Sequence, residues 1–281
     1  MSQKIYQLVT DRIIALLQQG VVPWMKPWTT NGRSAAPVNL LSGRPYRGVN
    51  VFLLIAQGFG SPYWLTFRQA QDRGGHVRRH EHGTPIIFWR VDDPETSEGA
   101  DGEEGLAEYR RVVLRYYTVF NVEQCEGIEI PATEAAEAGS AFDLIPACEA
   151  VYANMPHPPE LRHAGDHSTG HPSRLNRFAE EDNPGIFGSP AYAREELVAE
   201  MTAAMICGVL GIAPVKVEAI TPDGQEDLLL ESSAAYLRHW MDVLKADTRA
   251  VVIAATRAQK AADYILGTHQ QEEARQRDEA A

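Results

Sequence analysis

The chain has 281 residues, of which 44% are hydrophobic, and a formal net charge of −12 at pH 7. No apolar run is long enough to cross a bilayer, so we expect no membrane-embedded helix and no membrane partner. The three scattered cysteines, Cys125, Cys148 and Cys207, exclude a disulfide framework and favour a protein of the reducing cytoplasm.

The charge is divided unevenly along the chain. Residues 1–90 hold 11 Lys and Arg against three acids, a balance of +8, whereas the remaining residues hold 15 against 35, a balance of −20. Four of the five tryptophans also lie in the basic part. Such asymmetry predicts different partners for the two ends of the chain.

The first elements in the chain are predicted to be helices. Apolar residues at helical spacing predict a helix from the N-terminus to Gly20, and because charges interrupt its apolar pattern we do not interpret it as a signal peptide. Residues 44–58 predict a turn that leads into a short buried helix. Thr66 and Gln69 form a predicted capping box for a further helix that ends at glycines 74–75.

Two strands follow in the predicted order. The β-branched and aromatic composition of residues 84–91 and 110–122 predicts strands, with an acidic segment that contains glycine between them. We therefore predict an α+β domain over residues 1–130. Residues 131–281 form a second, mainly helical domain, with amphipathic helices predicted at 192–212, 231–247 and 248–267.

The basic part interleaves cations with flat rings. Unpaired nucleic acid is held by both, because cations follow the phosphates while bases stack on aromatic faces. We find no helix that carries the arginines and asparagines typical of duplex readers. The alternative is that the tryptophans belong to the core and the cations to an ordinary solvated face. The predicted residues of a single-strand surface are Trp24, Lys26, Trp28, Arg44, Tyr46, Arg47, Arg68, Arg78, Arg79 and Trp89.

Long stretches of the chain resemble one known family, the ArdC antirestriction proteins. They include "VPWMKPW", "PVNLLSGRPYRGVN" and "YWLTFRQAQDRGGHVRRHEHGTPIIFW" in the first half, and "NMPHPPELRHAGD", "HSTGHPSRLNRF" and "AREELVAEMTAAMIC" in the second. The resemblance implies a protein of a plasmid or other mobile element, linked to conjugation, that protects incoming DNA from host restriction. It also implies an N-terminal domain that binds single-stranded DNA and a C-terminal zincin-like domain of metallopeptidase type.

Three histidines at four-residue intervals, His163, His167 and His171, raise the question of a metal site. On a helix this spacing puts imidazoles on one face, as in the HExxH motif, in which a glutamate activates a zinc-bound water. Here the second position of the frame is Ala164, a glycine follows, and three prolines lie just upstream. These residues are poor surroundings for a helix.

The family resemblance gives a different interpretation of this stretch. "NMPHPPELRHAGD" resembles a segment that precedes the HExxH helix of the family, and "HSTGHPSRL" resembles the second half of that helix. We predict that the intervening residues are missing at the Asp166–His167 junction, so that His167 alone remains of the motif. A replacement of the glutamate by Ala164 is the alternative. His171 could restore coordination, but a glycine and a proline flank it.

The predicted helix over residues 192–212 retains a further element of the family's metal site. Glu196 and Glu200 are four residues apart and so share one face of that helix. By resemblance Glu196 would be a metal ligand, with Glu195 as an alternative, and Glu200 would orient a histidine. Without the resemblance, the same residues would be a solvated acidic face.

With His167 and Glu196 as the remaining candidate ligands and no general base, we expect weak Zn²⁺ binding or none, and no peptide hydrolysis. A catalytic zinc needs three protein ligands and a group that activates water. We therefore predict a DNA-binding accessory protein whose partner is single-stranded DNA and whose link to the host restriction system is indirect. Two alternatives stay open: a zinc metallopeptidase that regulates a partner through an atypical His/Glu site, and a decayed protein that folds only in its first half.

Overall fold

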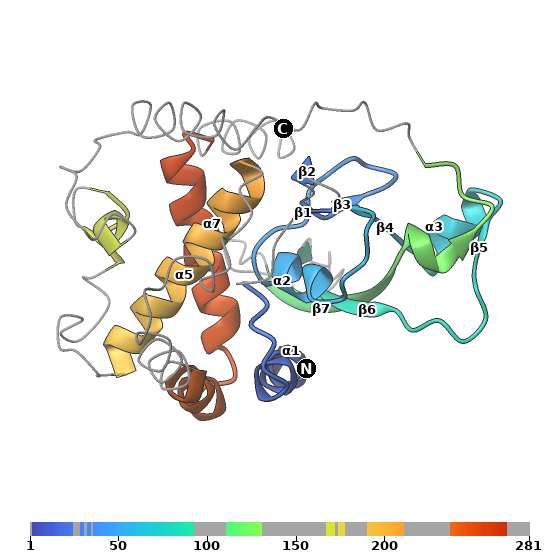
Figure 1. The fold of residues 1–281 in the computed structure, drawn as a ribbon. Helices are drawn as coiled ribbons and strands as arrows, with labels where there is room; N and C mark the ends of the chain where they lie inside the picture. Colours follow the sequence, from blue (N-terminus) through green and yellow to red (C-terminus); the bar gives the residue numbers. More distant parts are fainter. Residues whose placement is uncertain are drawn as a thin grey trace, which may run out of the picture.

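The computed structural model describes residues 2–24, 29–30, 33–34, 36–92, 111–130, 167–171, 174–177, 190–210 and 237–268. Figure 1 shows two long helices of the second half on one side of the molecule and the strands on the other, with α2 between them and α1 below. The bounds of these helices are α1 Ser2–Gln18, α2 Val49–Ile55, α5 Pro190–Leu210 and α7 Ala250–Ile265. The predicted α+β class is confirmed.

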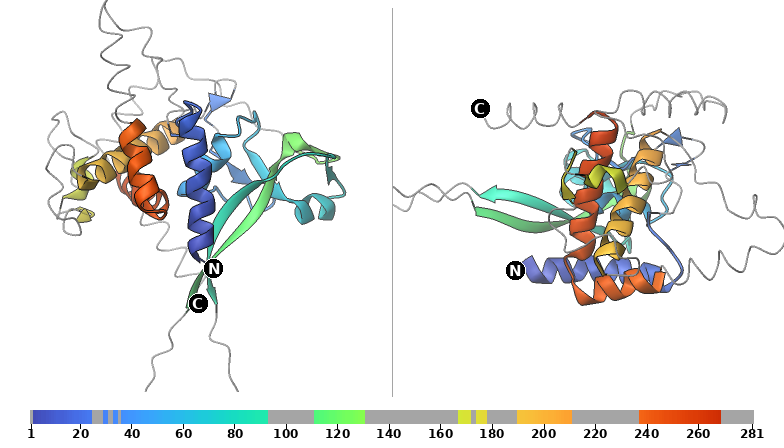
Figure 2. Two further views of the ribbon diagram at one scale, coloured as in Figure 1. Left: turned by 90° about the horizontal axis from the view of Figure 1, so that it is seen from below. Right: turned by 90° about the vertical axis from the view of Figure 1, so that its left-hand side faces the viewer.

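The main sheet has four strands in the order β3-β4-β7-β6. Their bounds are β3 Val38–Asn39, β4 Tyr63–Thr66, β6 Thr84–Asp92 and β7 Arg111–Asn121. The β3 and β4 strands are parallel, and the other pairs are antiparallel. The two long strands that were predicted, β6 and β7, pair along the whole of β6. Figure 2 shows the outer end of this hairpin projecting beyond the helices.

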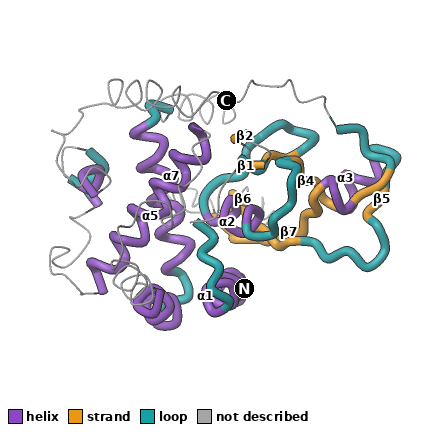
Figure 3. Tube along the Cα trace, in the orientation of Figure 1, coloured by secondary structure: helices purple, strands orange, loops and turns teal. Residues whose placement is uncertain are grey.

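Small elements complete the first half, as the tube in Figure 3 shows. They are β1 Thr29–Thr30, β2 Arg33–Ser34, α3 Phe67–Asp72, β5 His76–Val77, the 3-10 helix η1 Val122–Gln124 and β8 Cys125–Glu126. The predicted capping box is confirmed, because the Thr66 hydroxyl accepts from the Gln69 amide at 3.2 Å and the Gln69 side chain accepts from the Thr66 amide at 2.8 Å. The helix stops before Gly74, whose φ of 77° favours glycine.

The predicted helices of the second half are present where the structure describes them. The segment 192–212 lies largely in α5, and 248–267 contains α7. Of the segment 231–247, residues 237–246 are helical, and its first residues lie outside the described part of the chain. A further 3-10 helix, η2, spans His167–Gly170.

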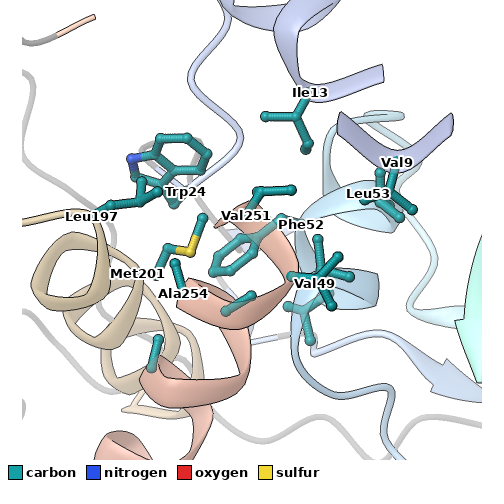
Figure 4. Close-up of a cluster of buried hydrophobic side chains, with 14 of the residues drawn as sticks. Val9, Ile13, Trp24, Val49, Phe52, Leu53, Leu197, Met201, Val251 and Ala254 are labelled. Atoms are coloured by element: carbon teal, nitrogen blue, oxygen red, sulfur yellow. The ribbon is translucent and has the colours of Figure 1, made fainter. Parts of the chain in front are cut away.

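One large hydrophobic cluster joins the two predicted domains (Figure 4). It takes Val9 and Ile13 from α1, and Phe52 and Leu53 from α2, both in the first half. The second half contributes side chains of α5 and α7, which include Leu197, Met201, Val251 and Ala254. The two halves are therefore packed against each other through buried apolar surface, and not merely joined by the chain.

The structure corrects the interpretation of Trp24 as a base-stacking residue. Its side chain is 3% exposed, and its ring makes edge contacts with Phe52 at 6.2 Å and Trp240 at 5.5 Å between centroids. The ring could reach a base only by leaving the core, so Trp24 belongs to the alternative set of core tryptophans. It also links the first half of the chain to the helix over residues 237–246.

We expect Trp24→Ala to lower the free energy of unfolding by about 3–5 kcal/mol, because it leaves a cavity in this shared cluster. Chemical denaturation of the full chain measures the change. The matched control is Ile253→Ala on α7, whose side chain is 42% exposed and should cost about 0.5 kcal/mol or less. Equal losses for the two variants would contradict a core role for Trp24.

Candidate nucleic-acid surface and metal centre

The predicted cation Arg47 joins the start of α2 to α7. Its guanidinium forms an ion pair with the Asp263 carboxylate of α7. The neighbouring Gly48 amide donates to the Gln259 side chain of α7 at 3.1 Å, and Gln259 in turn donates to Asp263 at 3.1 Å. Much of the Arg47 charge is therefore neutralised by a contact that holds the two halves together.

Arg78 is also paired with an acid. Its guanidinium donates to Glu81 at 2.7 Å, and the second Glu81 oxygen accepts from Gln124 at 3.0 Å. These hydrogen bonds, that from Gln124 first and that from Arg78 next, hold the pKa of Glu81 below its ordinary value. Arg68, by contrast, is 3.8 Å from Asp72 with both side chains exposed, and such a pair is weak enough to release the cation to a phosphate.

Tyr46 is held mainly by packing. Its half-buried ring lies against a small cluster that includes Trp64, and its hydroxyl accepts from the Asn39 amide group at 3.4 Å. Burial raises the pKa of Tyr46 above its ordinary value. One side of the Tyr46 ring packs against the core, so only its other side could contact a base.

The remaining predicted residues are divided between two regions and the undescribed part of the chain. The exposed residues Arg68, Arg78 and Arg79 lie on α3 and just after β5, which Figure 1 shows side by side at the end of the molecule far from α5 and α7. Arg44 is exposed on the turn after β3. Lys26, Trp28 and the side chain of Trp89 lie outside the described residues.

Sequence reasoning missed several exposed rings on the sheet. Phe88, Tyr116 and Tyr117 are 55%, 53% and 45% exposed, and Arg115 beside them is exposed as well. A signal was present in the sequence "RYYTVF", because adjacent residues of a strand point to opposite faces, so Tyr116 and Tyr117 cannot share one buried face. Composition alone did not distinguish these tyrosines from core residues.

The described part of the candidate metal region contains a buried ion pair. Arg177 and Glu195 are both buried, and the Arg177 Nε donates to Glu195 Oε2 at 3.4 Å while Nη2 donates to Oε1. The Arg177 Nη1 donates to the Thr169 hydroxyl at 2.8 Å. Because Thr169 belongs to η2 and Glu195 to α5, the guanidinium ties these two elements together.

This arrangement corrects Glu195 as an alternative ligand. Both of its oxygens are engaged by Arg177, and removing them would leave a buried cation without its partner. Glu196 is half-buried and Glu200 exposed on the same helix, and the side chain of His167 lies outside the described residues. Within the described ranges no three His, Cys, Asp or Glu side chains converge.

Removing one member of the buried pair, by Arg177→Met or Glu195→Leu, should lower the free energy of unfolding by about 3–5 kcal/mol. The double variant Arg177→Met with Glu195→Leu should recover most of the loss, because it leaves no buried charge. A thermal or denaturant double-mutant cycle measures the coupling. The exposed pair gives the control: Arg68→Met should cost less than about 1 kcal/mol. A similarly small loss for Arg177→Met would contradict a tie between η2 and α5.

The chain is similar to known proteins along both halves. Residues 3–120 match the N-terminal domain of anti-restriction factor ArdC, and residues 142–257 match a zincin-like metallopeptidase. The ArdC protein of plasmid R388 has been solved with Mn(II) bound and without metal. The Mn(II)-bound structure is 30% identical with a TM-score of 0.66, over 94% of this chain and 97% of that one. The metal-free structure is 31% identical with a TM-score of 0.65, over 95% and 98%.

Two kinds of curated relative are also similar. The uncharacterized protein y4eC of Sinorhizobium fredii is 33% identical, over 98% of this chain and 94% of y4eC. Two DNA primases TraC of Escherichia coli are 31% and 30% identical, and the chain spans 27% and 20% of their lengths. In the part of the chain that the structure describes, no helix is both long and apolar enough to cross a membrane.

The alignments support the prediction that this chain lacks residues which its relatives carry. The alignment with y4eC runs over 306 positions, which exceeds the 281 residues of this chain, so the chain lacks residues that y4eC carries. The alignments with the TraC primases run over 314 positions each. The location of the gap at the Asp166–His167 junction stays a prediction.

Proposed function

The chain belongs to the family of ArdC antirestriction proteins, and from that premise we propose that it binds single-stranded DNA and protects incoming DNA from host restriction enzymes. The observation that carries the proposal is the match of residues 3–120 to the ArdC N-terminal domain, over the part of the chain that holds the cation excess. Its place of action is the cytoplasm, where DNA that arrives by conjugation meets the restriction enzymes.

The charge distribution supports this function. Phosphates are attracted to the balance of +8 in residues 1–90 and repelled by the balance of −20 in the rest of the chain. We assign the phosphate contacts first to the exposed Arg68 and Arg79, with Arg44 and Lys26 as further candidates. Arg47 and Arg78 contribute less, because Asp263 and Glu81 already neutralise them. Trp28 and Trp89 are candidates for stacking on bases, and Tyr46 for a partial contact.

The full chain should bind a short single-stranded oligonucleotide more tightly than the same sequence as a duplex. The logarithm of the binding constant should fall with the logarithm of the salt concentration, by about 0.7 per phosphate neutralised. Fluorescence anisotropy over a series of salt concentrations measures both. An affinity that does not change with salt would contradict an electrostatic surface, and equal affinity for duplex would contradict the preference for unpaired strands.

We further propose that the zincin-like half serves as a scaffold and does not hydrolyse peptides. A metal in this family's site would polarise a bound water, and that chemistry needs three protein ligands and a base. The engagement of Glu195 by Arg177 supports the proposal, since it removes one carboxylate from the set of available ligands. The rival function is a metallopeptidase that uses His167 and Glu196, and the Mn(II)-bound R388 structure makes it worth testing.

Calorimetric titration of the full chain with Zn²⁺ or Mn²⁺ should show no tight binding of one ion per chain. Incubation with an unstructured protein substrate should give no cleavage, and a chelator should leave the affinity for single-stranded DNA unchanged. Glu196→Gln serves as the matched variant and should behave as the original chain. Tight binding of one ion, with peptide cleavage that Glu196→Gln abolishes, would establish the metallopeptidase instead.

A further inference from the structure

The β6–β7 hairpin leaves two neighbouring rings uncovered. Phe88 and Tyr117 are 55% and 45% exposed, and their rings meet edge to face with 6.4 Å between centroids. Two adjacent exposed rings form a small apolar patch, and a larger patch of this kind marks an interaction site. Figure 2 shows the outer end of the hairpin projecting beyond the described helices.

The strand register places both rings on one face together with a cation. Phe88 lies opposite Arg115, and Ile86 lies opposite Tyr117. Paired residues of an antiparallel hairpin point to the same face, and that face repeats at every second residue. Phe88, Arg115 and Tyr117 therefore form one continuous surface, which we call the hairpin surface.

The hairpin surface rests on a rigid base. Along the same face, Ile86 and Val119 are buried in a cluster with Leu54 and Trp64. The backbone of the adjoining residue is also fixed, because the Asn50 side chain both donates to the Ile87 carbonyl and accepts from its amide, each at 2.8 Å. The exposed rings thus sit on a sheet that is held in place, as a preformed binding surface requires.

The charge of the hairpin surface is positive. Among the residues that the structure describes, no carboxylate pairs with Arg115, in contrast to Arg47 and Arg78, which are paired with acids. A cation adjacent to flat rings is the combination that holds an unpaired strand, because the rings stack on bases and the cation meets a phosphate.

We propose that Phe88, Tyr117 and Arg115 form the surface on which unpaired bases stack, with the two rings as base platforms and Arg115 as a phosphate contact. The proposal rests on the single-strand binding proposed above and names residues for it that composition did not identify. Duplex DNA keeps its bases stacked within the helix, so this surface also accounts for a preference for single strands.

The sequence between the two strands limits the path of the DNA. Residues 93–110 carry seven acids and one arginine, and these charges repel phosphates. A strand is therefore expected to cross the hairpin at Phe88 and Tyr117 and not to follow it toward that segment. A second copy that docks through this same surface is a poorer occupant, because it would cover the Arg115 charge without a carboxylate described there to pair with it.

The chain offers a matched control at the next residue. Tyr116 is 53% exposed, but the register places it opposite Ile87, on the other face of the hairpin. Phe88→Thr and Tyr117→Thr keep a strand-forming residue and remove a ring, and each should weaken single-strand binding about 5- to 150-fold. Tyr116→Thr should bind as the original chain does.

The cation is tested separately. Arg115→Gln should weaken binding and lower the salt slope by about 0.7, as expected for the loss of one phosphate contact. Lys245→Gln is the control, because Lys245 is an exposed cation on the helix over residues 237–246. It should leave both the affinity and the slope unchanged.

The outcomes separate this proposal from the function on which it rests. If the original chain binds no single-stranded DNA, both fail. If it binds, and the variants Phe88→Thr and Tyr117→Thr bind equally well, or Tyr116→Thr loses as much, the hairpin surface is overturned while the proposed function stands. Sedimentation that shows a dimer broken by Phe88→Thr, with DNA affinity unchanged, would also overturn it.

A second measurement uses the unmodified chain, so it tests the proposal even if a variant does not fold. An oligonucleotide that carries 5-iodouracil is cross-linked by light to the unmodified full chain, and the attached peptides are identified. Cross-links at Phe88 or Tyr117 support the proposal. Cross-links confined to other parts of the chain overturn it.

Discussion

The burial of apolar surface between the two halves of the chain is the constraint on which the rest of the structure depends. The helices α5 and α7 and the helix over residues 237–246 cover the apolar faces of α1 and α2 and the ring of Trp24. Each half therefore needs the other to bury its side chains in this cluster. The sheet contributes from both of its faces, because Ile87 lies in the shared cluster while Ile86 lies in a separate one. The inner sheet is therefore fixed, and the outer hairpin is the part left free to meet a partner.

The same packing decides what the charged residues do. Where the halves meet, Arg47 is neutralised by Asp263, and at the η2–α5 contact Arg177 is neutralised by Glu195. A buried carboxylate that balances a buried guanidinium is costly to separate from it and so is a poor metal ligand. Arg68 on α3 and Arg115 on the hairpin lie away from these contacts, and we propose that they meet an external phosphate. In this chain a carboxylate of the zincin-like half thus takes part in internal cohesion.

Local patterns predicted the elements well because they depend on neighbours in sequence. The capping box at Thr66, the strands β6 and β7, and the helices α1 and α7 follow from period, composition and caps within a few residues. The helix α5 was predicted to be amphipathic, but it is buried on most of its faces. The site was harder to predict. A tryptophan and a tyrosine in a basic segment have the same composition whether they face a core or solvent, so Trp24 was misassigned and Tyr117 was overlooked.

By itself, the sequence determined the α+β class, the charge asymmetry, the absence of an intact HExxH motif and, through long motifs, the family. These properties are local or additive along the chain, so no knowledge of distant contacts is needed to read them. The tertiary structure alone decided that Glu195 is paired with Arg177, that Arg47 meets Asp263, and that Phe88 and Tyr117 share one exposed face with Arg115. The physical reason is that burial and pairing depend on residues far apart in the sequence, which only the packing of the two halves and the strand register bring together.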